Sequence, residues 1–164
     1  MSSWRGALVP FVVLVSGCAS SPPPESKPSP LLAKAMPGFE LEPLNGETRD
    51  SGSFYGRTLV LSFVSADCTP CDRTLQAAQH VYAGDHELVV VAVFGSDRET
   101  AARLSSKHGV KFPVAVDGEG IVARRFDVDE RPRTFVVDAQ GRVTWVGGAE
   151  LTEDSLSRAV SAAR

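Results

Sequence analysis

Two nearly continuous apolar runs constrain the fold of this chain more than any other feature. TLVLSF at residues 58–63 and ELVVVAVF at residues 87–94 contain few polar side chains, which is typical of strands covered on both faces. Between them, apolar side chains recur at helical spacing and predict a helix over residues 72–82. A strand, a helix and a strand in succession indicate an α/β fold.

The flanking segments extend this architecture. FELEPLNGETRD at residues 39–50 alternates apolar and polar side chains around an Asn-Gly turn, which predicts a strand pair at a sheet edge. Ser96 and Glu99 form a capping box that predicts a helix over residues 98–108, with Gly109 ending it. Three elements follow: a strand at 113–117, a hairpin at 134–147 turning at Gln140-Gly141, and a last helix capped by Thr152. The order predicts a three-layer α/β sandwich.

Length and charge narrow the class of function. A chain of 164 residues with 43% hydrophobic content has room for one domain, which can bury a hydrophobic core without stabilising disulfides. The formal net charge is −3, and the basic residues are scattered among acids. No basic stripe is therefore available for a phosphate backbone, and nucleic acid is excluded as a partner.

The first residues predict an export signal. Residues 1–17 combine Arg5 with an apolar run over residues 7–15, about half of the roughly 20 residues that a membrane-spanning helix needs. The following Val-Ser-Gly-Cys sequence is similar to a bacterial lipobox and makes Cys18 the expected lipidation site. Ordinary cleavage nearby, which leaves Cys18 free, is the alternative. Lipidation accounts for the odd cysteine count, because three cysteines minus one leave a pair.

A spacer is predicted between this site and the folded domain. Residues 18–35 are rich in Pro and Ser and have little to bury, which is typical of an extended, semi-rigid tether. The folded domain is expected over residues 36–164. Ala19, directly after the expected lipidated cysteine, is not the Asp that often retains lipoproteins at the inner membrane of enteric-type bacteria. An outer-membrane location is therefore preferred.

The remaining cysteines, Cys68 and Cys71, have three physical uses. A structural zinc ion needs four ligands, but the chain has no second cysteine pair and its three histidines are isolated, so no metal or cofactor is expected. A structural disulfide across so short a loop would constrain little chain entropy. Thiol-disulfide exchange is favoured, because the pair follows a strand and precedes a helix.

The position of the pair assigns a role to each sulfur. Cys68 is expected at the helix N-terminus, where unpaired N–H groups and the helix dipole favour the thiolate. Pro70 suits the first turn, because its missing N–H costs nothing there, and it stiffens the loop. Cys71 is expected to be more buried and to resolve the mixed disulfide.

In these segments the chain resembles the thioredoxin superfamily, and within it the membrane-tethered thiol-disulfide oxidoreductases of the TlpA and ResA type. The resemblance rests on PGFELEPLNG, TLVLSFVSADCTPC, HGVKFPVAVDGEGIVARRFDV and RPRTFVVDAQGRV, in that order, and it covers residues 36–164. It implies a thioredoxin-like α/β/α sandwich with a central mixed sheet. It also implies a cis bond between Arg131 and Pro132, facing the cysteines, where the backbone pairs with an extended substrate segment.

The chain departs from the family at positions that affect the chemistry. Asp67 replaces the usual Trp, and Ser62 and Thr74 stand where relatives carry acids that can serve as a general base. Asp67 is expected to oppose the Cys68 thiolate. Arg131 precedes the proline and Arg133 follows it; they support the thiolate if they turn toward the sulfur, and a solvated rim without net effect is the alternative.

The leading hypothesis is an exported, lipid-anchored, monomeric thiol-disulfide oxidoreductase. The resemblance implies reduction of other exported proteins, such as apocytochrome c, with a membrane or periplasmic thiol donor supplying electrons. A thiol peroxidase is one alternative, although Leu61 stands where peroxiredoxins have Pro and only Ser65 suits their pattern. A binding module without turnover is the other. The sequence leaves open the substrate, the donor, the redox potential and the direction of electron flow.

Overall fold

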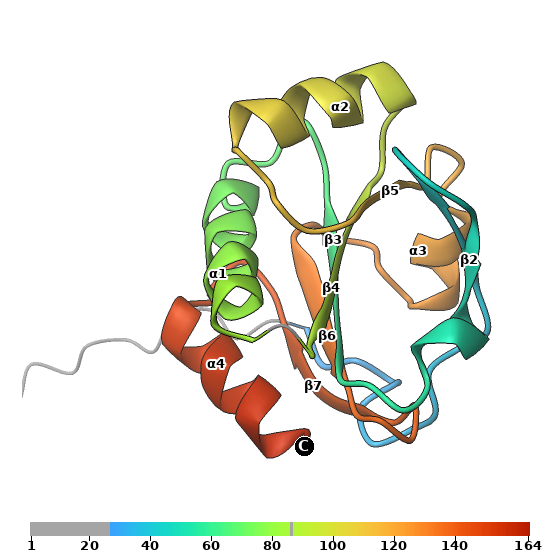
Figure 1. Ribbon diagram of the computed structural model, residues 1–164, viewed down its shortest axis with the longest axis vertical. Coiled ribbons are helices and arrows are strands. Elements are labelled where there is room, and N and C mark those ends of the chain that lie inside the picture. Colours follow the sequence, from blue (N-terminus) through green and yellow to red (C-terminus); the bar gives the residue numbers. More distant parts are fainter. Residues whose placement is uncertain (1–26, 86) are drawn as a thin grey trace, which may run out of the picture.

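The strands predicted from the apolar runs form the centre of a mixed sheet (Figure 1). The computed structural model describes residues 27–85 and 87–164, so the predicted signal and Cys18 lie outside the described residues. The strands are β1 (Glu40–Pro43), β2 (Arg49–Asp50), β3 (Leu59–Val64), β4 (Val89–Phe94), β5 (Val114–Val116), β6 (Arg133–Val137) and β7 (Val143–Gly147). Their order in the sheet is β2-β1-β5-β4-β3-β6-β7. Strands β3, β4 and β5 are parallel, and the other neighbours pair antiparallel.

Helices cover both faces of this sheet. They are α1 (Cys71–Gly84), α2 (Arg98–Lys107), α3 (Ile121–Arg125) and α4 (Glu153–Ala162), with a 3-10 turn η1 (Ser51–Phe54). Figure 1 shows α1 and α4 together on one face and α3 on the other, while α2 lies across the carboxyl end of β4. The α/β sandwich with a central mixed sheet is confirmed.

Strand β3 shows why the apolar runs lack polar positions. All six of its residues are buried, because alternate side chains enter two separate cores. Val60 and Val64 pack with α1 and α4, whereas Leu61 and Phe63 belong to the core on the α3 side. Aromatic rings fill this second core; those of Phe63 and Phe126, for example, have centroids 5.4 Å apart.

Of the two predicted helix caps, one is confirmed and one is wrong. Thr152 caps α4 by accepting the N–H of Ser155, as expected. The capping box of Ser96 and Glu99 was wrong, because Asp97 caps α2 through an Oδ1 that accepts the Thr100 N–H at 2.8 Å. The helix begins at Arg98, so its cap is the residue directly before, and the expected box was one residue out of register.

The chain ahead of β1 lies along the edge strand β7. Ala33 donates its N–H to the Val143 carbonyl at 2.8 Å, and Val143 donates in return to Lys34 at 2.8 Å. This pairing satisfies backbone groups that an edge strand otherwise leaves free. Within residues 27–85 and 87–164, no helix has the length and apolar character needed to cross a bilayer.

Candidate active site

The cysteine pair lies at the junction of β3 and α1. Cys68 and Cys71 form a disulfide with an S–S distance of 1.97 Å and Cα atoms 5.3 Å apart. Cys71 is the first residue of α1 and is 3% exposed, whereas Cys68 lies in the loop before the helix and is half-buried. Pro70 is the N-cap residue with helical backbone angles. Cys71 is thus the more buried sulfur, as expected, and the order of reactivity remains a prediction.

The segment around Pro132 lies at the same end of the sheet. Arg133 pairs with Phe63, so Pro132 is placed level with the end of β3, where the cysteine loop begins. Pro132 is buried, and its bond to Arg131 is cis, as the resemblance implied. The cysteine loop and the Pro132 loop, which are far apart in the sequence, therefore lie at the same end of the sheet.

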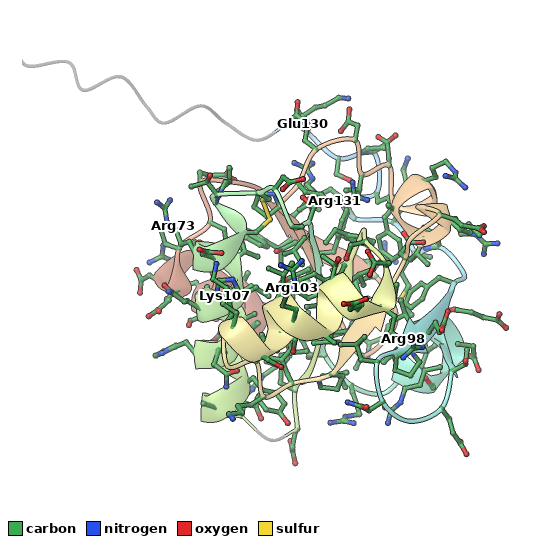
Figure 2. All side chains as sticks on the ribbon, turned by 90° about the horizontal axis from the view of Figure 1, so that it is seen from above. Arg73, Arg98, Arg103, Lys107, Glu130 and Arg131 are labelled. Carbon is green, nitrogen blue, oxygen red and sulfur yellow. A yellow bond between two sulfur atoms is a disulfide. The ribbon has the colours of Figure 1, made fainter. Side chains whose placement is uncertain are left out.

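The two arginines beside this proline have different environments. Arg131 lies over Gly95: a Cβ placed there would be 3.0 Å from three atoms of the guanidinium group. Its Nε is buried and has no hydrogen-bond partner among the described residues. Figure 2, which looks down on α2, shows Arg131 on the same side of the molecule as the disulfide, with Arg103 and Lys107 in front. Its charge is therefore available on the cysteine side.

Arg133 instead contacts the N-terminal segment. Its guanidinium donates to the carbonyl oxygen of Lys27. The Nζ of Lys27 lies 2.5 Å from the Asp129 carboxylate. This hydrogen bond lowers the pKa of Asp129 and raises the pKa of Lys27. The described chain thus starts against the loop that leads to Pro132.

Ser62 and Thr74, where the resemblance led us to expect acids, carry buried hydroxyl groups. Ser62 Oγ and Thr134 Oγ1 are 3.0 Å apart and satisfy each other across β3 and β6. Thr74, in the first turn of α1, is 1% exposed. Neither position supplies a group that accepts a proton near neutral pH.

A pocket of about 340 Å³ lies next to the disulfide, between the start of α1 and the end of α2. Cys68, Cys71, Asp67, Asp72, Lys107 and His108 are among its lining residues. His108 is 16% exposed in its side chain, and its Nε2 is 3.2 Å from Asp72 Oδ1.

No histidine was expected from the sequence to take part in the site. His108 follows the end of a predicted helix, and no local pattern places that helix end beside the cysteines. Among the described residues no group of three or more His, Cys, Asp or Glu is arranged to hold a metal ion. The site therefore comprises one disulfide, a flanking proline loop, and charged groups from three elements.

Comparison with known proteins matches this arrangement. The AhpC/TSA family matches residues 32–146. The thiol-disulfide oxidoreductase ResA of Bacillus subtilis is 28% identical over 123 residues, which are 73% of this chain and 69% of ResA.

Solved structures agree with the sequence relatives. DsbF of Mycobacterium tuberculosis superposes with a TM-score of 0.71 and 29% identity, covering 77% of this chain and 95% of DsbF. A secreted disulfide oxidoreductase of the same organism, described as homologous to DsbE, gives a TM-score of 0.69 and 26% identity. That match covers 76% of this chain and 95% of the other. The thioredoxin-like fold is confirmed.

Proposed function

Because this chain belongs to the AhpC/TSA family, we propose that it is an exported, lipid-anchored enzyme that reduces disulfides in other exported proteins. It is a thiol-disulfide oxidoreductase of the ResA and DsbE type. The observation that carries the proposal is the Cys68–Cys71 disulfide, with one accessible and one buried sulfur ahead of a helix.

The reduced pair acts in two steps. The thiolate of Cys68 attacks a substrate disulfide and forms a mixed disulfide, releasing one substrate thiol. The Cys71 sulfur then attacks Cys68, re-forms the protein disulfide and releases the second substrate thiol. Substrate backbone pairs with Arg131 beside Pro132, as an added strand would, and Asp67 and Pro70 tune the reactivity of the pair.

Reduction is the proposed direction, with apocytochrome c or similar exported proteins as substrates. A membrane or periplasmic thiol protein returns the electrons. The relative from Mycobacterium tuberculosis is described as secreted, which supports export. The relatives named ResA and DsbF support exchange with partner proteins.

The lipid anchor at Cys18 is the second part of the proposal. Residues 18–35 serve as the tether, and its last part contacts the domain near the site, since Lys27 binds beside Asp129 and Arg133. An anchor at Cys18 ties the domain to a membrane through this tether, with the outer membrane preferred because of Ala19. The domain, residues 36–164, acts as a monomer.

Substrate trapping tests the activity. The Cys71→Ser variant, added to an extract of exported proteins, is expected to retain mixed disulfides that dithiothreitol releases, while the Cys68→Ser variant retains none. Wild type is expected to reduce the interchain disulfides of insulin at a rate above that of dithiothreitol alone. A wild-type rate equal to that background would favour the binding module, and rapid consumption of hydrogen peroxide would favour the thiol peroxidase.

A further inference from the structure

The pocket on the α2 side of the disulfide contains a candidate proton acceptor for Cys71. Exchange requires that the Cys71 thiol lose a proton before its sulfur attacks, and Cys71 is 3% exposed. The buried polar residues of β3 and of the first turn of α1 are Ser62 and Thr74, whose hydroxyl groups do not accept a proton near neutral pH. The acceptor must therefore come from another element or from solvent.

The pocket brings a histidine to both cysteines. Cys68 and Cys71 line it from the start of α1, and His108 lines it from the end of α2. The other ionisable groups in its lining are Asp67, Asp72 and Lys107. Histidine is the one among these types whose ordinary pKa allows proton exchange near neutral pH.

Asp72 fixes the orientation of this histidine. Its Oδ1 is 3.2 Å from Nε2, and the His108 side chain is only 16% exposed. A carboxylate at that nitrogen favours the tautomer with the proton on Nε2, which leaves Nδ1 as an acceptor. A nucleophile, a base and a group that orients the base form the usual arrangement for activating a thiol.

The ion-pair partner of His108 among the described residues is Asp72. Lys107 precedes it and lines the same pocket, and a second pocket on its other side is lined by His80 and two glutamines. His80 points to α4, where its Nδ1 is 3.7 Å from Glu153, and its side chain is 63% exposed. Asp72 is thus the carboxylate that contacts the ring.

We propose that His108, positioned by Asp72, accepts the Cys71 proton through the pocket when Cys71 resolves the mixed disulfide. The proposal rests on the proposed function, because it specifies a step of that reaction. The Cys71 S–H bond breaks and its proton moves to the imidazole, directly or through one water molecule. The sulfur then bonds to Cys68 and displaces the substrate sulfur as a thiolate, which takes up the proton. Two protein thiols are oxidised as one substrate disulfide is reduced.

A small aromatic disulfide separates the two steps. Reduced protein mixed with 5,5′-dithiobis(2-nitrobenzoate) in excess under single-turnover conditions releases one coloured thiolate as Cys68 is modified and a second as Cys71 resolves. His108→Gln is expected to slow the second release by about 100-fold, the lower range for general acid–base catalysis, and the first by less than about twofold. Asp72→Asn is expected to slow the second release less.

His80→Gln is the matched control and should change neither phase. The pH profile distinguishes proton transfer from a structural role: the pH dependence of the second phase should differ between wild type and His108→Gln. An unchanged second phase in His108→Gln, or the same pH profile as wild type, would overturn the proposal. Because this probe needs no protein substrate, the result does not depend on whether wild type reduces insulin.

Discussion

The guanidinium group of Arg131 lies against Gly95, at the end of β4. A Cβ on Gly95 would lie 3.0 Å from Cζ, Nε and Nη2 of that arginine. The position of the Arg131 side chain thus depends on Gly95, which lies in the connection between β4 and α2. Its positive charge lies on the cysteine side of the molecule (Figure 2).

Gly95→Ala should displace this charge without unfolding the protein. Gly95 is not in the left-handed backbone region, so alanine fits the chain, and the flexible guanidinium has to shift. Both Gly95→Ala and Arg131→Gln are expected to slow reaction with oxidised glutathione, an anion, by about fivefold, as roughly 1 kcal/mol of Coulomb energy implies. Reaction with neutral hydroxyethyl disulfide should not change.

Gly84→Ala is the matched control, because an added Cβ there meets no atom within 4 Å. The difference in rate loss between the two disulfides should shrink at high salt, since salt screens the attraction between Arg131 and an approaching anion. Equal losses with both disulfides would contradict a role of Arg131 in attracting anionic substrates.

Asp67→Asn should increase the reactivity of Cys68. Asp67 is exposed and lines the pocket with Cys68, so its carboxylate disfavours a neighbouring thiolate. The expected results are alkylation by iodoacetamide about fivefold faster at neutral pH and a more oxidising couple, because the reduced form is stabilised. Asp154→Asn in α4 serves as control, and an unchanged alkylation rate would count against the electrostatic role.

The hydrogen bond between the buried hydroxyl groups of Ser62 and Thr134 should make the effects of substituting these two residues on stability non-additive. Ser62→Ala leaves the Thr134 hydroxyl unpaired in the sheet interior and is expected to lower the free energy of unfolding by about 1–3 kcal/mol. Adding Thr134→Val should recover most of this loss, because both polar groups are then removed. Denaturant unfolding measures both, and additive losses in the double variant would contradict the pairing.

The contact between Lys27 and Asp129 should be insensitive to pH near neutrality. Because the pKa of Asp129 is lowered in the folded protein, its contribution to the free energy of unfolding is present above the unfolded pKa of about 3.9. That contribution is lost as pH falls through the folded pKa. Because the pKa of Lys27 is raised in the folded protein, its contribution to the free energy of unfolding is present below the unfolded pKa of about 10.4. That contribution is lost as pH rises through the folded pKa. Lys27→Met should raise the pKa of Asp129 in an NMR titration. An unchanged Asp129 titration would mean that the contact does not form in solution.

Cys18→Ala should abolish membrane association. The sequence VSGC is similar to a lipobox, so the mature protein is expected to begin at a lipidated Cys18. Fractionation and mass spectrometry of the mature protein test this, and density-gradient separation distinguishes the inner from the outer membrane. A Cys18→Ala protein that still carries lipid would refute the proposed anchor.

Most of the fold was determined locally by the sequence. The apolar runs predicted β3 and β4, and Gln140-Gly141 predicted the turn between β6 and β7, where Gly141 has φ of 79°. Such features follow from side-chain periodicity and backbone preference within a few residues. The same local reading placed the cysteine pair between a strand and a helix, and so predicted which sulfur is accessible.

The contacts that complete the site were decided by tertiary packing. The sequence could name Arg131 as a departure but not place it on Gly95, and it gave no reason to join His108 to Asp72. These pairs form because the β4–α2 connection and the end of α2 come to lie against other elements. Side-chain neighbours across elements depend on how helices pack on the sheet, which no local pattern encodes. The sequence therefore determined the sulfur chemistry, and the packing determined which charges surround it.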